Sequence, residues 1–139
     1  MKKHIDDNCI FCKLANGQIP TNSIYEDDDF KVILDAAPAA KGHAIILPKT
    51  HAANLFELPE EYGEKIFAIA KKCGKAIKET YNYDGLNVLQ NNGEAAGQTV
   101  FHLHVHLIPR MNDDKININW QQRESTDGET VAEEIKKNI

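Results

Sequence analysis

The chain has 139 residues, 42% of them hydrophobic and 27% charged; these are the proportions of an ordinary globular protein, and we expect a single domain over residues 1–139. Its formal net charge of −5 argues against a nucleic-acid polymer as partner, because duplex binding needs clustered Lys and Arg, but it does not exclude a small phosphorylated ligand. No apolar run reaches membrane-spanning length and residues 1–13 lack a signal-peptide core, so we expect a cytoplasmic protein with no membrane partner.

The first feature along the chain is the cysteine pair of "CIFC", Cys9 and Cys12. Three cysteines in all are an odd number for a disulfide framework, and the cytoplasm keeps thiols reduced. The C-x2-C spacing is that of half a zinc site, while the alternative is two small buried side chains. A redox centre is less favoured, because such motifs lie at a strand-to-helix junction of a βαβ unit. The third cysteine, Cys73, is interpreted as a core residue.

The following segments predict an α+β fold. Strands are recognised by short apolar runs between turn residues, and one long helix by apolar residues at three- and four-residue steps. We expect a mainly antiparallel sheet of about five strands, with the long helix packed on it and a C-terminal helix closing the chain. In order, the predicted elements are turns over 15–30, strands at 31–35 and 43–48, the long helix at 59–79, a strand at 86–93, a loop at 94–99, a strand at 101–109 and a helix at 129–139.

Three histidines alternate in "GQTVFHLHVHLIPR", at His102, His104 and His106. Alternate side chains of a strand share a face, so the three rings would lie on one face and the intervening apolar side chains on the other: Phe101, Leu103, Val105 and Leu107. Neutral imidazole is a common metal ligand, and two neighbouring rings could share an ion. Three could not do so without distortion, because the outer two start about 13 Å apart, so at least one ring needs another role.

A histidine can also attack phosphorus and form a covalent intermediate. The attacking ring must be neutral, with one nitrogen free and the other N–H held by an acceptor. The phosphoryl oxygens need donors as well, and the segment 91–99, "NNGEAAGQT", offers amides, a hydroxyl and glycine backbone. On these residues alone the metal and nucleophile hypotheses both stay open.

The histidine segment resembles the motif of the histidine triad (HIT) family, His-x-His-x-His followed by apolar residues and preceded here by Gly-Gln-Thr. The resemblance extends to "CIFCKLANGQIP" and "LDAAPAAKGHAIILPKTH" and ends after "IPRMNDDKININW". It implies a nucleotidyl hydrolase or transferase of the Hint-like and bacterial HIT kind. Such an enzyme would cleave a nucleoside 5′-phosphate from an amine, an acyl group or another phosphate, with a purine nucleotide as substrate and AMP on a histidine as intermediate.

The resemblance also implies roles for individual residues. His104 would be the nucleophile, His106 would contact the phosphate, and His43 would support proton relay to the leaving group. Asp35 would accept from the ribose hydroxyls, although it could equally cap the turn before Pro38. The further contacts implied are Asn91, Gly97, Gln98 and Thr99 with the phosphate, and Ile10, Phe11 and Leu14 with the base.

Zinc is the cofactor that the resemblance suggests. Some HIT proteins, and the related galactose-1-phosphate uridylyltransferases, hold a structural zinc ion on two Cys and two His. The ligands implied here are Cys9, Cys12, His51 and His102, which would give the first triad histidine a separate role. Other HIT proteins lack the cysteines and fold without metal. HIT proteins are commonly twofold dimers, so we expect a homodimer by resemblance alone.

Three functional hypotheses follow. The first is a nucleotidyl hydrolase with His104 as nucleophile, and the second is a zinc-stabilised nucleotide-binding or interaction module with little turnover. The third is a metallohydrolase with an open metal site at His104 and His106. Arg110 is interpreted as either a solvated strand end or a phosphate contact, and Trp120 as lining the site or buried in the core.

Overall fold

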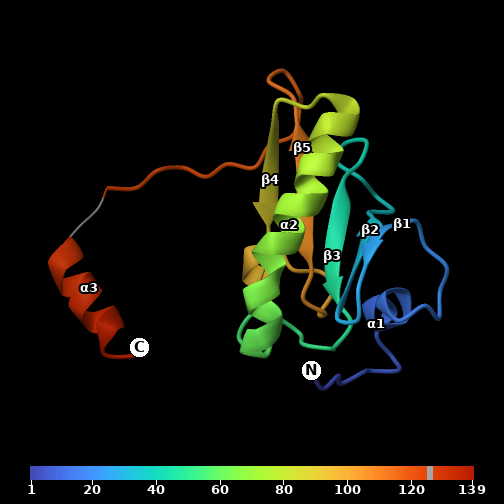
Figure 1. Cartoon of the computed structure of the whole chain (residues 1–139). Helices are drawn as coiled ribbons and strands as arrows, with labels where there is room; N and C mark the ends of the chain where they lie inside the picture. The colour runs from blue at the N-terminus through green and yellow to red at the C-terminus, as the bar shows by residue number, and fades with distance from the viewer. Residues whose placement is uncertain (125–126) are drawn as a thin grey trace.

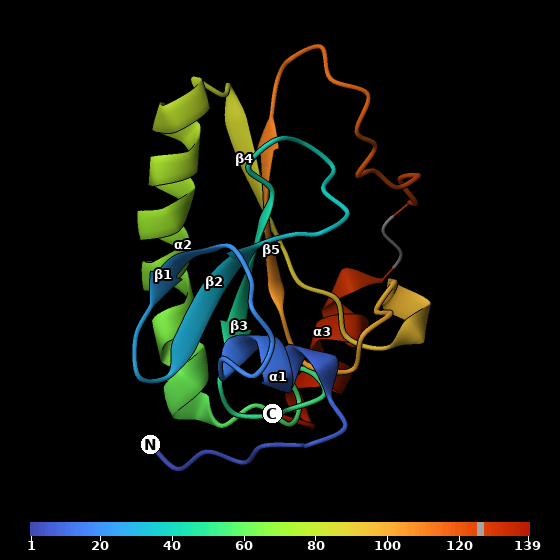
Figure 2. The same cartoon turned by 90° about the vertical axis from the view of Figure 1, so that its right-hand side faces the viewer.

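The computed structural model describes residues 1–124 and 127–139 and contains one antiparallel sheet, in the order β1-β2-β3-β5-β4. Helix α2 covers one face of this sheet and α1 lies at the other (Figures 1 and 2). The predicted α+β fold is confirmed. The elements are α1 (Ile10–Ala15), β1 (Ser23–Glu26), β2 (Phe30–Leu34), β3 (Ala44–Pro48), α2 (Glu60–Tyr81), β4 (Gly85–Leu89), the 3₁₀ turn η1 (Glu94–Ala96), β5 (Val105–Arg110) and α3 (Gly128–Lys136).

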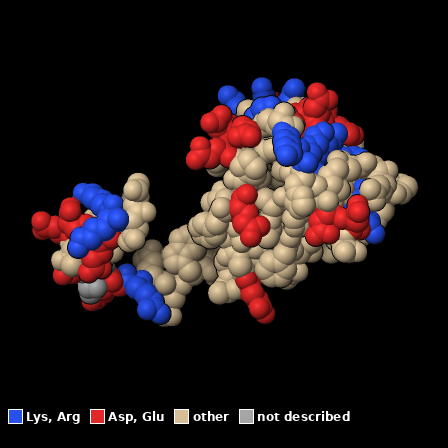
Figure 3. Space-filling model, turned by 90° about the horizontal axis from the view of Figure 1, so that it is seen from below, with Lys and Arg blue, Asp and Glu red and all other residues tan. Residues whose placement is uncertain are grey.

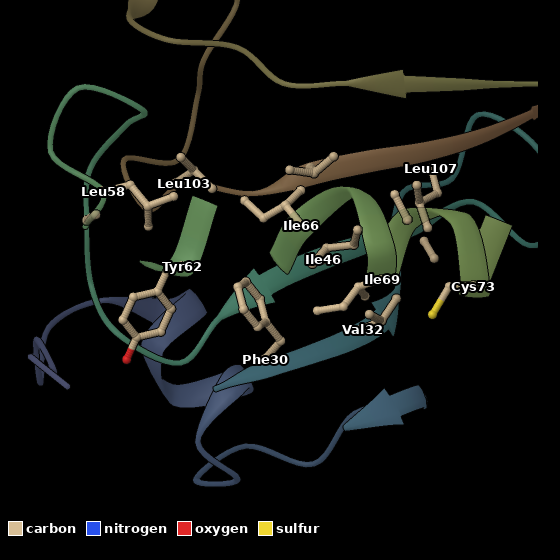
Figure 4. Packing of buried hydrophobic residues seen from close by; sticks show 14 of the residues in the cluster. Phe30, Val32, Ile46, Leu58, Tyr62, Ile66, Ile69, Cys73, Leu103 and Leu107 are labelled. Atoms are coloured by element: carbon tan, nitrogen blue, oxygen red, sulfur yellow. The ribbon is translucent and has the colours of Figure 1, made fainter. Parts of the chain in front are cut away.

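The central strands β2 and β3 are buried on both faces, which is why they are continuous apolar runs in the sequence. Val32 and Ile46 join the cluster beneath α2, which Figure 4 shows from close by. Ile33 and Ile45, one residue away in each strand, join a smaller cluster with α1. The sheet therefore holds α1 on the face opposite α2. Helix α1 forms one wall of the site described next.

Helix α2 confirms the predicted long helix. It begins after Pro59 with Glu60 and Glu61 in its first turn, where acidic side chains favour the positive end of the helix dipole. It ends at Asn82, which adopts a left-handed conformation with φ 56°. Its apolar side packs on the sheet as the helical spacing predicted.

The predicted strand at 101–109 is only partly correct. β5 begins at Val105, so of the three histidines only His106 lies in the paired strand. The preceding segment leaves the sheet because the Leu103 N–H donates to the Ala52 carbonyl instead of to a strand. The alternation still holds for Leu103, which is buried with Val105 in the core. Phe101, predicted on the core face, is 53% exposed.

The sequence did not predict β1 or α1. The segment containing β1 was interpreted as turns, yet it forms a four-residue edge strand with an irregularity between Ser23 and Tyr25. Its outer positions are mostly exposed, so it lacks the apolar alternation by which strands are recognised. Helix α1 has six residues, too few for a helical repeat to be seen.

The C-terminal helix α3 forms at the predicted place, but it stands apart from the sheet at the end of an extended arm (Figure 1). On the arm Trp120 is 81% exposed, so it is not in the core. Seen from below, acidic and basic side chains are mixed over α2 and α3 rather than gathered into a basic patch on that face (Figure 3). Over the described residues, no helix has both the length and the apolar character needed to cross a membrane.

Candidate active site

His104 presents one free ring nitrogen at the surface of the sheet. Its Nδ1 lies 2.7 Å from the His102 carbonyl oxygen. A carbonyl can only accept, so Nδ1 carries the proton and Nε2 of the neutral ring keeps its lone pair. The Phe11 ring packs edge-on against the imidazole, with centroids 4.9 Å apart, and limits its rotation. The ring therefore has the protonation pattern that a nucleophile requires.

His43 and His106 form a second, connected pair. The Ala39 N–H donates to His43 Nδ1 at 2.9 Å, so neutral His43 carries its proton on Nε2. That nitrogen lies 2.9 Å from His106 Nδ1, which must accept and leave its own N–H on Nε2. The rings of His106 and His104 have centroids 5.0 Å apart. A backbone amide thus orients a chain of imidazoles that ends beside the nucleophile.

Burial keeps this pair neutral. Burial, together with the neighbouring His104 and His43, lowers the pKa of His106 from 6.5 to about 4. Burial also lowers the pKa of His43. The Asp35 carboxylate opposes both shifts from 3.5 Å and 3.7 Å, because it favours the protonated rings. A bound phosphate anion would act in the same direction as Asp35 and make a proton available there.

The same tautomers argue against an open metal site at these histidines. Donor atoms of Asp35, His43 and His106 do lie within 4.8 Å of one another. However, His43 Nδ1 already accepts a backbone N–H, so its Nε2 could bind an ion only as an imidazolate. His106 similarly holds a proton on Nε2 when its Nδ1 accepts from His43. This geometry supports proton transfer between the rings rather than the open metal site of the metallohydrolase hypothesis.

A groove of about 590 Å³ runs from this cluster along the α1 face of the sheet. Phe11 and Leu14 of α1 form one wall, Ile33 and Ile45 of the sheet form the floor, and Asp35 lies at the catalytic end. Apolar walls with a carboxylate at one end suit a nucleoside, whose base is flat and whose ribose carries hydroxyl donors. Asp35 also caps its turn, since Oδ1 accepts the Ala37 N–H while Oδ2 faces the histidines.

Two residues expected at the substrate lie elsewhere. Ile10 is 48% exposed and faces a different groove, on the other side of α1 from the one that Phe11 lines. Gln98 is buried, its Oε1 accepts the Gly93 N–H, and its Nε2 donates to the Ala53 carbonyl at 2.6 Å. We therefore interpret Gln98 as a residue that shapes the loop rather than one whose amide contacts phosphate.

The loop also brings Gly97 and Asn91 close together. Gly97 adopts φ 95°, a left-handed conformation that favours glycine, and a Cβ there would lie 3.6 Å from the Asn91 amide nitrogen. The loop therefore holds its backbone close to the Asn91 side chain. Thr99 lines the groove that Ile10 faces.

Cys9, Cys12, His51 and His102 form the second cluster of the site, with their donor atoms within 4.8 Å of one another. The His102 N–H at Nε2 donates to the Pro48 carbonyl at 3.0 Å, so Nδ1 keeps its lone pair and lies 3.4 Å from both sulfurs. His51 Nδ1 lies 3.4 Å from Cys12 Sγ. A tetrahedral zinc ion separates its S and N ligands by about 3.6 Å, which these distances fit.

The donor chemistry fits a cation as well. Burial, together with the neighbouring Cys9, raises the pKa of the Cys12 thiol to about 11. Two adjacent buried thiolates are therefore unfavourable by themselves and need a bound cation. Cys12 and His102 are buried and Cys9 and His51 are partly buried, and four protein donors fill a tetrahedral shell, as expected for a structural site rather than a catalytic one.

Comparison with known proteins places these two clusters in a family. The family model described as "HIT domain" matches residues 16–113. The chain is a member of the HIT family. The matched region contains the whole sheet and all three histidines of the triad, and Cys9 and Cys12 precede it.

Several relatives of this HIT protein are similar over much of its length. "Protein hit" of Bacillus subtilis is 45% identical over 77% of this chain and 74% of its own length. The protein named adenosine 5′-monophosphoramidase in Schizosaccharomyces pombe is 41% identical over 95% of this chain and 98% of its own. A crystal structure of a HIT family protein from Bacillus anthracis has a TM-score of 0.89, with 41% identity over 96% of this chain and 98% of that one.

A zinc-bound relative is also known. The crystal structure of a Zn-bound histidine triad family protein from Mycobacterium smegmatis has a TM-score of 0.75 and 38% identity, and the match covers 84% of each chain.

Some features of this HIT site were not visible in the sequence. Three backbone groups set the tautomers of His43, His104 and His102: the Ala39 amide, the His102 carbonyl and the Pro48 carbonyl. Because every residue has these backbone atoms, the residue types in the sequence do not reveal such contacts. Arg110 proves not to be a phosphate contact: its guanidinium pairs with Asp114 at 2.8 Å and with the Asn87 side chain.

Proposed function

We propose that this HIT protein hydrolyses AMP-type phosphoramidates, or related adenylylated or dinucleoside polyphosphate substrates, through a nucleotidyl intermediate on His104. The observation that supports this most directly is the free Nε2 of His104, created by donation of Nδ1–H to the His102 carbonyl. The phosphoramidase named in S. pombe, 41% identical, supports the choice of substrate class.

The first step forms the intermediate. His104 Nε2 attacks phosphorus as the bond from phosphorus to the leaving amine breaks, and the amine nitrogen departs with that electron pair. The nitrogen takes up a proton from the His43–His106 pair, which gained it from solvent when the phosphate anion bound. The Nδ1–H bond to the His102 carbonyl stabilises the positive charge that develops on His104.

The second step releases AMP. Water attacks phosphorus, the N–P bond electrons return to His104 Nε2, and the proton of the water passes to the His43–His106 pair. The overall reaction consumes one water and yields AMP and a free amine. In this scheme Phe11 and Leu14 hold the base, Asp35 accepts from the ribose, and Asn91 and the Gly97–Thr99 backbone face the phosphate.

We assign the second cluster to a structural zinc ion held by Cys9, Cys12, His51 and His102. A bound zinc ion would hold the chain before α1 against the sheet, and with it Phe11 and Leu14. His104 and His106 are then free for phosphate chemistry. The zinc-bound M. smegmatis relative supports this assignment.

We further propose a homodimer formed through the α2 side of strand β4. β4 pairs only with β5, so its other edge has unpaired backbone groups. Phe67 of α2 and Val88 of β4 are 75% and 42% exposed and line an apolar depression there. A second copy would pair the open edge and cover these side chains.

The test of the reaction is release of AMP from adenosine 5′-phosphoramidate. The native chain should release AMP, His104→Ala should lose at least about 10³-fold in rate, and His4→Ala, an exposed histidine outside both clusters, should not change it. Acid-quenched reactions of the native chain should contain AMP bound to His104 by mass spectrometry. Tight AMP binding with no release from any substrate of this kind would instead favour the nucleotide-binding module.

A further inference from the structure

A second groove, of about 510 Å³, lies on the opposite side of α1 from the nucleoside groove. One bank is the chain leading into α1, with Asp6, Asn8 and Ile10, and the other is the segment Thr99–Phe101. Ile10 and Phe101, one on each bank, are 48% and 53% exposed and give the groove an apolar lining. No step of the reaction described so far uses this groove.

The order of residues along the segment 101–106 relates the second groove to the nucleoside groove. His106 is the end nearest Asp35, with 3.7 Å between Nδ1 and the carboxylate, and the nucleoside groove begins there. His104 is central, and Phe101 precedes it at the other end, on the bank of the second groove. A phosphorus atom at His104 with its nucleoside toward Asp35 carries two nonbridging oxygens and one further substituent, which lies opposite Nε2 during attack and can extend past Thr99–Phe101. That substituent is the leaving group.

The lining of the groove indicates which leaving groups fit. Asp6 is its one charged side chain, apart from the metal-cluster residues Cys9 and His51, and none of the described residues that line it is Lys or Arg. The Asp6 Oδ1 accepts the Asn8 N–H, which fixes the carboxylate at the bank. An acidic group beside two apolar side chains matches an alkyl chain that ends in a cation. A polyphosphate leaving group would meet a carboxylate and no basic side chain.

We propose that this groove is the leaving-group subsite and that it selects alkyl amines carrying a second positive charge, with Asp6 as the specificity-determining residue. The proposal rests on the proposed function, since it assigns the amine half of the same substrate. It favours diamine monoamidates of AMP over dinucleoside polyphosphates.

The test uses three AMP phosphoramidates of matched length: N-(3-aminopropyl), which is cationic, N-propyl, which is neutral, and N-(2-carboxyethyl), which is anionic. Dissociation constants are measured on His104→Ala, which should not turn the probes over, so the result does not depend on hydrolysis. We expect the cationic probe to bind about threefold to fivefold more tightly than the neutral one and about tenfold more tightly than the anionic one, as for one half-exposed charge pair. Values of kcat/KM for the native chain should follow the same order.

Variants in the same His104→Ala background locate the effect. Asp6→Asn keeps the oxygen that caps Asn8 and should abolish the preference, Asp6→Lys should reverse it, and Asp7→Asn, which removes a neighbouring charge outside the groove, should leave it unchanged. Phe101→Ala should weaken binding of the three alkyl probes but not of unsubstituted adenosine 5′-phosphoramidate.

Equal affinities for the three probes, or a preference that persists in Asp6→Asn, would overturn the subsite. If the native chain cleaves none of the probes while the order of affinities holds, the subsite stands and the proposed hydrolysis fails.

Discussion

Three histidines of the site, His43, His102 and His104, each have their tautomer set by one backbone atom. The His102 carbonyl holds the proton of His104 on Nδ1, and the Ala39 amide pushes that of His43 onto Nε2. A backbone partner is fixed by the fold and has no rotamers, so the rings are aligned before substrate arrives. The site thus needs no reorganisation to present its nucleophile.

A first prediction concerns His43 as the inner member of the proton relay. We expect His43→Ala to lower kcat by about 10²-fold with little change in KM, because His43 delivers a proton and does not line the nucleoside groove. The loss should be much smaller for the AMP amidate of 4-nitroaniline, an amine so weakly basic that it can leave without a proton. Steady-state kinetics on this amidate and the N-propyl amidate would check it. Equal losses for both would exclude a relay role.

A second prediction uses the lowered pKa of His106. The folded-state value of about 4 lies below the ordinary 6.5, so as the pH falls the unfolded chain binds the proton first. The neutral ring therefore contributes stability that is complete above pH 6.5 and is lost as the pH falls from 6.5 toward 4.

Urea unfolding at a series of pH values tests this. His106→Asn should reduce the slope of the unfolding free energy against pH by up to about 1.4 kcal/mol per pH unit between pH 6 and 4.5. His4→Ala is the matched control, because His4 is exposed. An unchanged slope in His106→Asn would show that the ring is not buried as a neutral base.

At the scale of single residues, the sequence predicted which residues lie at the site better than it predicted what each side chain does there. The alternating histidines left a metal site and phosphorus chemistry open, the HIT resemblance favoured the second, and the structure brings His104, His106, His43 and Asp35 together. The sequence could not predict that the Gln98 side chain donates to the Ala53 carbonyl. A glutamine that shapes a loop and a glutamine that contacts a ligand cannot be told apart in the sequence.

Among the helices and strands that form the site, α1 depends most on the rest of the fold for its stability. A helix of six residues is not stable alone, because nucleation is unfavourable and few hydrogen bonds follow it. It is held by Ala15 and Phe11 against the sheet and by Cys9 and Cys12 in the proposed zinc cluster. A zinc ion bound at this cluster would therefore support one wall of the nucleoside groove.

A third prediction follows for removal of the metal. The purified chain should contain about one zinc per chain, and a chelator should lower the melting temperature by about 10 °C, which corresponds to a few kcal/mol. The apparent KM for nucleotide should rise because Phe11 loses its support. Cys12→Ser should have the same effects, whereas Cys73→Ala, a core cysteine far from the cluster, should keep full zinc content.

Elemental analysis and thermal melts provide the measurements. Full turnover and unchanged melting in a zinc-free chain would contradict a structural role. Immediate loss of turnover in a chain whose melting is unchanged would instead support a catalytic metal.

The elements themselves were predictable to the extent that each had a periodic apolar pattern. The long helix and the buried strands β2 and β3 had one. β1 is short, irregular and mostly exposed, so its pairing with β2 is set by tertiary structure rather than by its own residues. The start of β5 was misplaced because the chain bends at residues 100–102 and Leu103 then bonds to the Ala52 carbonyl rather than to a strand.

For the whole molecule, the open edge of β4 leads to a fourth prediction. If β4 and α2 form the dimer interface, Phe67→Glu or Val88→Glu should convert a dimer into a monomer, because a buried carboxylate without a partner is costly. Light scattering after gel filtration would measure this. Ile24→Glu, on the edge strand at the other side of the sheet, is the matched control. Dissociation by the Ile24 variant alone would place the interface at β1.

The bond between His104 and the carbonyl of residue 102 has a consequence for how such a sequence can evolve. Every amino acid carries that oxygen, so a substitution at position 102 would remove an imidazole from the cysteine cluster yet leave the neighbouring tautomer intact, provided that the chain keeps its path. The His102 side chain is therefore required by the cysteine cluster and by the buried Pro48 carbonyl, and not by the tautomer of His104. The side chain of His104 is itself the proposed reactive group.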